Sequence, residues 1–448
     1  MYKSNQLKSW ALVLLLSSSF ASFAQASGQT FTLEQAQAFA LENSYMSLNA
    51  QREITKSQKK VNETIGTGLP QVSATGNYQR YIQTPLSLIP ASAFGGPEGE
   101  FAEVFLGTEQ QMGLGLRAEQ LIFDGSYFVG LQAAKVYLEL SKNDLKRSDM
   151  EVKQMVTIAY GNVLVAQRNS EILAGNVESL KKSAFETEEL YKNGFIEEQD
   201  KDQIQLTLAN VQNSYNNAVR MIEISKNQLK FTMGINVESG IELTDDLVTV
   251  TKASTSKAYL SNEFNPSNHV EFQIINTQKT ATELLLKQQK STALPRLSAF
   301  YNFSSNSFAN EFDFLDNKRF YNGQLIGLNL NVPIFSGLSR YNRIQQAEID
   351  VEKIETTKTQ VEQQLILEAH NAKSEYTFTL SQYNTTESNM ELAQSIYTKT
   401  KVKYEEGISS SIELTTANNQ LLESQANFIN AAFQLIQAKS NLDKALNQ

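Results

Sequence analysis

Few residues in this chain have the types and spacing that chemistry needs. The 448-residue sequence contains two histidines and no cysteine, so disulfides, thiol catalysis and cysteine-ligated zinc are excluded. His269 and His370 lie 101 residues apart, and neither begins a metal-ligand spacing. Gly113-x-Gly115-x-x-Ala118 resembles a dinucleotide fingerprint, but it lies within an alternating strand pattern and opens no helix. With no nucleophile–base set, we expect no enzyme, no metal site and no cofactor.

Two similar turns form the most informative polar pattern. Tyr191-x-x-Gly194 is followed by Asp200, and Tyr404-x-x-Gly407 is followed by Glu413 at the same spacing. One interpretation is purely structural, since glycine ends a helix with positive φ and an acid favours the start of the next helix. The other is that these acids line a narrow mouth, where a ring of carboxylates would favour cations. Residues 186–202, which include Asp202, contain seven acids and two lysines.

Long helices must position these turns. The chain has only seven prolines, and none lies within 98–265 or 334–448. Because proline breaks helices, we expect long helices at 126–191 and 338–404, each followed by a return helix. The return helices carry apolar residues seven apart, with a small residue three positions after most of them, which is typical of a coiled coil. These apolar residues are Leu414, Leu421, Phe428, Leu435 and Leu442, and in the first half Leu208, Tyr215, Ile222 and Leu229.

The chain is internally duplicated. Leu69-Pro70 returns as Leu294-Pro295, Ile122-Phe123-x-Gly125 returns 212 residues later, and Tyr191-x-x-Gly194 returns 213 residues later. Each half reads as helix, strand, loop, strand, long helix, turn and helix. The first helix is expected from Thr32, with Gln35 completing a capping box, to about Ile65. We expect a first repeat at 27–233, an irregular linker at 234–266 and a second repeat at 267–448.

Four segments alternate between apolar and polar residues. They lie at about 69–80, 111–123, 294–304 and 324–335. Alternation over about ten residues is typical of transmembrane barrel strands, although the pattern alone also fits a half-buried soluble sheet. Four strands cannot close a barrel, so other copies of the chain would have to complete it. We therefore expect an obligate oligomer, with 81–110 and 304–323 as exposed loops.

The N-terminal segment has the features of a secretory signal peptide. Lys3 and Lys8 precede a short apolar run, and we expect 1–26 to be a signal peptide. Ala24-Gln25-Ala26 offers one cleavage site, and Ser22-Phe23-Ala24 offers another. With 48 acidic and 39 basic residues, the net charge is −9, and an acidic exported chain is not expected to bind nucleic acid. Because no later segment is long and apolar enough for a spanning helix, any membrane insertion would use strands.

These features together resemble the TolC-type outer-membrane channel family, also called outer membrane efflux proteins. The opening Leu33-x-x-Ala36-x-x-x-Ala40-Leu41-x-Asn43 is similar to that family's first helix. The duplication, the Leu-Pro strand starts, the Phe-x-Gly strand ends and the two Tyr-x-x-Gly turns also match. The resemblance implies an α+β, mostly α fold: a TolC-like trimeric α/β-barrel channel with four barrel strands per chain and long coiled-coil hairpins.

The resemblance also implies partners and sites. A periplasmic adaptor, also called a membrane fusion protein, would dock on the turns at Tyr191, Gly194, Tyr404 and Gly407. Asp200, Asp202 and Glu413 would form a periplasmic gate. Family members with an acidic pair carry both acids in the second turn, whereas here Thr416 occupies the second position.

The function that follows is a passive exit duct of a tripartite export system. The homotrimer would lie in the outer membrane of a Gram-negative bacterium, in contact with its lipid, with a large periplasmic part. It would serve an inner-membrane efflux pump or ABC exporter, with multidrug efflux preferred and type I protein secretion as the alternative. A structural coiled-coil stalk or adhesin without a conduit is the non-channel alternative.

Overall fold

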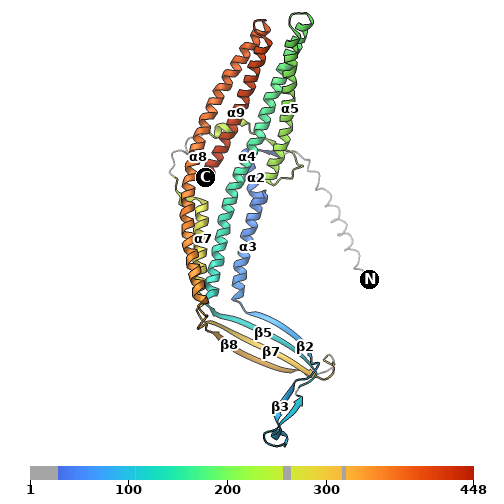
Figure 1. Cartoon of the computed structure of the whole chain (residues 1–448), viewed down its shortest axis with the longest axis vertical. Coiled ribbons are helices and arrows are strands. Elements are labelled where there is room, and N and C mark those ends of the chain that lie inside the picture. The colour runs from blue at the N-terminus through green and yellow to red at the C-terminus, as the bar shows by residue number, and fades with distance from the viewer. Residues whose placement is uncertain (1–28, 106, 256–263, 315–318, 448) are drawn as a thin grey trace, which may run out of the picture. The chain divides into compact units, whose positions relative to one another are not determined.

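The computed structural model describes residues 29–105, 107–255, 264–314 and 319–447 (Figure 1). The predicted signal peptide at 1–26 lies outside these residues. The chain forms two compact units, each assembled from separate stretches. The hairpin unit contains the described residues up to Arg52, Asn143–Gln273 and those from Gln360 onward, and the sheet unit contains Glu53–Lys142 and Ile274–Thr359.

A four-stranded antiparallel sheet dominates the sheet unit. Its order is β2-β5-β7-β8. The strands are β2 (Gln71–Arg80), β5 (Gln110–Asp124), β7 (Arg296–Ala309) and β8 (Tyr321–Asn331). Because β2 and β8 pair on one side only, the sheet has two open edges, and every residue of β2 is exposed.

The sheet separates its side chains as the alternation predicts. The apolar face is exposed and carries Val72, Leu114, Leu116, Tyr301, Ile326, Leu328 and Leu330. On the opposite face, Thr75, Gly115, Ser304 and Gly323 form one row across the four strands. At Gly115, a Cβ would lie 2.8 Å from the hydroxyl oxygen of Thr75, so a larger residue there would displace the Thr75 side chain. The sheet therefore has a closely packed polar face and an uncovered apolar one.

Residues 81–110 differ from the exposed loop that the sequence predicts. They contain β3 (Leu86–Pro90), a 3₁₀ turn η1 (Ala91–Phe94) and β4 (Phe101–Phe105). β3 and β4 pair as a two-stranded ribbon, in which Leu88 lies opposite Glu103. Figure 1 shows this ribbon extending from the end of the four-stranded sheet. Three prolines and four glycines favour an irregular segment, but β3 extends to Pro90 and β4 contains neither residue type.

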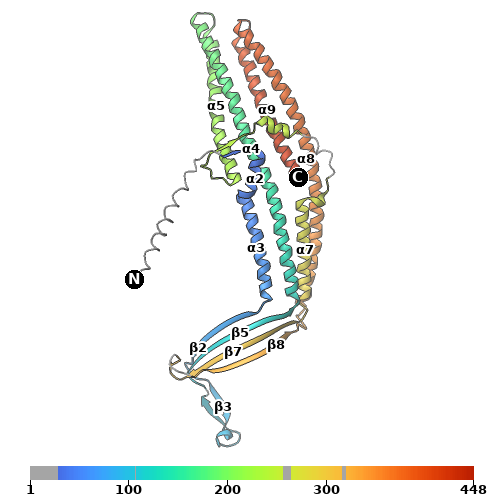
Figure 2. The same cartoon turned by 180° about the vertical axis from the view of Figure 1, so that it is seen from behind.

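Four helices of the chain form two antiparallel hairpins, seen clearly in Figure 2. The first is α4 (Gly125–Lys192) with α5 (Glu198–Met233), and the second is α8 (Ser339–Glu405) with α9 (Ser411–Leu446). The heptad seam of α9 is buried, and Leu435 and Leu442 are 0% exposed. The coiled-coil prediction for α9 is therefore confirmed. The α5 seam is less buried, since Leu208 and Tyr215 are only partly covered.

Helix α3 (Tyr45–Thr67) and helix α7 (Val270–Ser291) run beside the lower parts of the two long helices. Within the sheet unit, the hydroxyls of Ser57 and Ser141 are 2.7 Å apart and join α3 to α4. Lys279 pairs with Glu355 at 3.0 Å, which joins α7 to α8. Both halves therefore repeat the same local arrangement of a short helix against a long one.

A belt of short elements packs on the hairpin unit. It comprises β1 (Gln29–Phe31), α2 (Leu33–Asn43), β6 (Ile241–Leu243) and α6 (Leu247–Ala253), and β1 pairs with β6 in parallel. The buried Tyr160 hydroxyl donates to the Phe31 carbonyl at 2.9 Å and lies 3.0 Å from Asp245. Asp245 also accepts the Leu33 backbone N–H at 2.8 Å. The described part of the predicted linker 234–266 thus contains one short strand and one short helix between irregular stretches.

The first helix is also not continuous. Thr32 and Gln35 form the predicted capping box, but α2 ends at Asn43, and Ser44 adopts an extended conformation before α3 begins at Tyr45. Gly234, which follows α5, packs against the backbone of Asn43 and Ser44. The interruption lets the start of the chain pack against α5, a long-range contact with no local signal.

None of the helices within the described ranges combines the length and the apolar character that a membrane-spanning helix needs.

Candidate functional site

The two predicted turns join the helices of each hairpin and have the same geometry. Gly194 and Gly407 both have φ of 75°. In each turn the glycine N–H donates to the tyrosine carbonyl at 2.9 Å, Gly194 to Tyr191 and Gly407 to Tyr404. The next residue donates back to the carbonyl five positions earlier, which completes a Schellman-type helix end. The repeat therefore places two equivalent turns at the ends of two hairpins.

Polar contacts join the two hairpins near these turns. The hydroxyls of Thr187 and Tyr404 lie 3.0 Å apart, and those of Ser179 and Tyr397 lie 3.1 Å apart. Below them, Ile204, Tyr397, Leu414 and Leu421 share a buried apolar cluster. The two turns are thus held on neighbouring hairpins by hydroxyl pairs and a small core.

The predicted docking residues differ in their exposure. Gly194 and Gly407 are exposed, and a Cβ on either would meet no atom within 4 Å. Tyr191 and Tyr404 are half-buried. The Lys201 ammonium lies 4.7 Å from the centre of the Tyr191 ring, and Tyr404 is engaged with Thr187. The tyrosine side chains therefore make contacts inside the hairpin unit, while the backbone of the two glycines is exposed to solvent.

Sequence reasoning missed the two apolar side chains that follow the glycines. Phe195 is 77% exposed and Ile408 is 72% exposed. They occupy equivalent positions in the duplicated turns, and this equivalence is the signal that could have identified them. Exposed apolar side chains at matching tips offer a partner protein a pair of similar contacts.

The predicted gate acids are already engaged within the chain. Asp200 accepts a hydrogen bond from the Ser411 hydroxyl of the other hairpin. Asp202 forms a 3.3 Å ion pair with Lys201 and remains largely exposed. Glu413 accepts from the Ser410 backbone N–H at 2.9 Å and from the Ser409 hydroxyl, which makes it the reciprocal partner of a capping box. These bonds lower the pKa of Glu413, with the Ser409 hydroxyl as the main cause.

The Glu413 cap should make the start of α9 sensitive to acid. Because the pKa of Glu413 is lowered in the fold, its contribution to stability is present above the unfolded pKa of about 4.3 and is lost as pH falls through the folded pKa. We expect faster amide hydrogen exchange at 411–413, relative to α9's centre, at pH 3 than at pH 6. Glu413→Gln should remove most of this difference, and an unchanged pH dependence in that variant would contradict the assignment.

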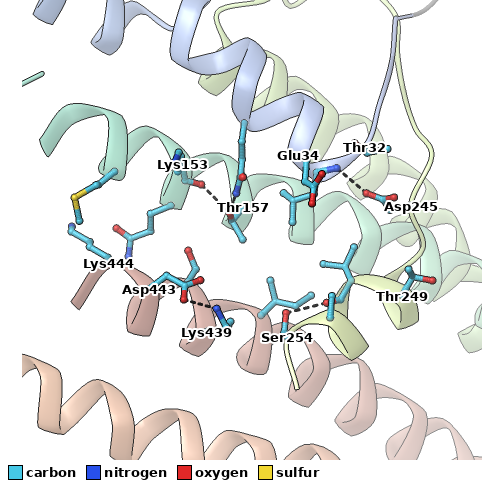
Figure 3. A pocket seen from close by; sticks show the side chains of 18 residues that line it. Thr32, Glu34, Lys153, Thr157, Asp245, Thr249, Ser254, Lys439, Asp443 and Lys444 are labelled. Atoms are coloured by element: carbon cyan, nitrogen blue, oxygen red, sulfur yellow. Dashed lines mark hydrogen bonds and ion pairs between the residues drawn. The ribbon is translucent and has the colours of Figure 1, made fainter. Parts of the chain in front are cut away.

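A cavity of about 540 Å³ lies between α2, α4, α6 and α9 (Figure 3). Its charged lining is balanced, with three lysines and three acids: Lys153, Lys439, Lys444, Glu34, Asp245 and Asp443. Lys439 is paired with Asp443, and Asp245 holds the start of α2. Across the cavity, the Gln37 side-chain amide of α2 donates to the Thr157 hydroxyl of α4 at 2.8 Å, which joins the belt to a long helix.

The histidines form no site. His269 is buried, with its Nε2 3.2 Å from the Lys444 carbonyl oxygen, while His370 is exposed on α8. Within the described ranges, no three His, Asp or Glu side chains are grouped as metal ligands would be.

Comparison with known proteins identifies the fold. The structure matches the CmeC outer membrane channel of Campylobacter jejuni, with a TM-score of 0.70 and 17% identity, over 92% of this chain and 85% of that one. It also matches VceC of Vibrio cholerae, with a TM-score of 0.67 and 15% identity, over 92% and 95% of the two chains. No curated protein matches the sequence. Residues 278–448 match the family model described as outer membrane efflux protein. The chain has the fold of TolC-type outer-membrane channels.

The TolC-type fold over 92% of the chain accounts for the duplicated hairpins and the four strands together. The solved relatives are described as channels rather than enzymes.

Proposed function

We propose that the protein is the outer-membrane exit duct of a tripartite export system and passively conducts small molecules from a periplasmic adaptor and inner-membrane pump to the exterior. The observation that carries this proposal is the open four-stranded sheet. Its edges are unpaired and its apolar face is uncovered. Neither feature suits an isolated chain. An unpaired strand edge can form hydrogen bonds with a strand of another chain. A large exposed apolar patch is typical of a surface that contacts protein or membrane.

A homotrimer would satisfy both edges. The three antiparallel pairings in the order β2-β5-β7-β8 leave β2 and β8 running in opposite directions. The β8 of one copy can therefore accept the β2 of the next copy in the same antiparallel manner. Three copies would form a closed twelve-stranded sheet, with outer-membrane lipid against the apolar face and the polar face lining the duct.

The mass of the purified protein in mild detergent tests this assembly. We expect a particle of three copies that remains intact through size-exclusion chromatography with light scattering. A stable monomer would contradict the proposal, because its sheet edges and apolar face would then need no partner chain.

The turns at Tyr191, Gly194, Tyr404 and Gly407 are the proposed docking site for the periplasmic adaptor. The exposed Phe195 and Ile408 support this role, since they give each hairpin an apolar contact at the same position. The pump would supply the energy and choose the substrate, with small-molecule efflux as the proposed cargo. No feature in the described residues favours type I protein secretion or a stalk without a conduit.

The acids near the turns are proposed to form the periplasmic gate, where three copies would multiply their charge. Asp202 and Glu413 are exposed, and Asp200 is half-buried. We expect that replacing Asp200, Asp202 and Glu413 by Ala reduces the block of ion conductance by divalent cations at least several-fold. Planar-bilayer recordings with and without Mg²⁺ measure this effect, and Glu34→Ala serves as a distant control. An unchanged block in the triple variant would show that the gate lies elsewhere.

A further inference from the structure

The ribbon of β3 and β4 has an apolar face with nothing covering it. Along both strands, exposed and half-buried residues alternate, so one face points outward. Leu86, Leu88, Phe101 and Phe105 are all between 46% and 64% exposed on that face. A two-stranded ribbon is marginally stable by itself in water. Its outward face is therefore expected to rest against another surface.

The position of the ribbon restricts what that surface can be. The ribbon follows directly from β2, which is one open edge of the four-stranded sheet. In the closed assembly proposed above, the β8 edge of the neighbouring copy lies beside β2. The ribbon of one copy therefore lies near the end of the neighbouring copy's sheet where β7 ends and β8 begins, which is called the β7–β8 end below.

The β7–β8 end offers a matching patch. Phe308 and Tyr321 are 46% and 53% exposed, and their ring centres lie 6.3 Å apart. The guanidinium of the exposed Arg319 lies 5.3 Å from the centre of the Tyr321 ring. On the ribbon, Glu103 lies between Phe101 and Phe105 on the outward face. Glu103 therefore lies among apolar side chains on the ribbon, Arg319 lies beside two aromatic rings on the β7–β8 end, and these two charges are opposite.

The charge of the ribbon segment argues against an anionic lipid surface as the occupant. Residues 81–110 contain four glutamates and no lysine or arginine. Segments that bind anionic headgroups are rich in basic residues, and this one has none. We propose that the outward face of β3–β4 packs against Phe308, Arg319 and Tyr321 of a second copy of this chain. This interface rests on the proposed assembly through β2 and β8.

Cysteine pairs test the interface directly, because the natural chain has no cysteine. In a chain carrying both Leu88→Cys and Tyr321→Cys, we expect disulfide-linked dimers and trimers on a non-reducing denaturing gel of outer membranes. Ser87→Cys with Tyr321→Cys is the matched control, since Ser87 is the neighbouring residue on the other face of the ribbon. Equal cross-linking by the two pairs, or no linkage by the first, would overturn the proposal.

A second pair separates failure of this interface from failure of the assembly. Val72→Cys on β2 is combined in turn with Gln324→Cys, Ile326→Cys or Leu328→Cys on β8. If one of these edge pairs links chains while Leu88→Cys with Tyr321→Cys does not, the ribbon interface is wrong and the assembly stands. If no edge pair links chains either, the proposed assembly itself fails.

Charge reversal provides an independent readout. We expect Glu103→Arg, and separately Arg319→Glu, to lower the yield of the Leu88–Tyr321 cross-link at least several-fold. The double reversal should restore most of the yield, because the two charges are again opposite. Equal losses in the single and double variants would contradict contact between these two side chains.

Discussion

Gly234→Ala will destabilise the hairpin unit by about 3 kcal/mol or more. Gly234 ends α5 with φ of 79°. A Cβ at this position would overlap the Asn43 carbonyl oxygen and lie 2.8 Å from its carbonyl carbon. Both atoms are backbone and cannot rotate away. The belt helix α2 would therefore have to move away from α5.

Gly407→Ala is the matched control for this prediction. Gly407 has φ of 75°, close to that of Gly234, but a Cβ there would meet no atom within 4 Å. Only the left-handed backbone strain of about 1–2 kcal/mol remains. Thermal unfolding of the detergent-solubilised protein should give a clearly lower Tm for Gly234→Ala than for Gly407→Ala. Equal Tm values would show that the packing of Gly234 against α2 is not important for stability.

Phe195→Asp together with Ile408→Asp will abolish export and leave the channel assembled. Both side chains are more than 70% exposed, so their replacement should change the free energy of unfolding little. A charge in place of each apolar contact would oppose docking of the adaptor. We expect cells carrying the double variant to become as sensitive to exported compounds as cells lacking the protein.

Three measurements make this result specific. Phe378→Asp replaces a 62% exposed phenylalanine in the middle of α8 and should leave export unchanged. The mass of each variant in detergent and its conductance in planar bilayers should equal those of the natural protein. Normal export by the double variant would exclude the turns as the docking site. Loss of assembly in the double variant would instead assign Phe195 and Ile408 to contacts between copies.

The sequence predicted the regular parts of the fold because their signals are local. The long helices end within two residues of the predicted limits, because Gly194 and Gly407 follow the helix ends in segments that contain no proline. The heptads of α9 identified a seam in which Leu435 and Leu442 are fully buried. Strand alternation similarly separated the apolar face of the sheet from the polar one.

The parts that were missed depend on contacts between distant residues. The parallel pairing of β1 with β6 joins Gln29 to Ile241, and three residues of strand carry no periodic signal. The end of α2 at Asn43 depends on Gly234, and the hydrogen bond of Asp200 depends on Ser411 in the other half of the chain. The ribbon was hidden because prolines and glycines flank its short strands. For the candidate site, the sequence identified the turns but not the exposed Phe195 and Ile408.

Single-channel recording of the purified protein in a planar lipid bilayer tests the central claim most directly. The proposed trimer encloses a continuous path lined by the polar face of the sheet, so we expect discrete steps of ion conductance. The steps should grow with salt concentration and should persist in the Phe195→Asp and Ile408→Asp double variant. A preparation that is assembled and inserted in the bilayer but conducts no ions would contradict the claim that this protein is an exit duct.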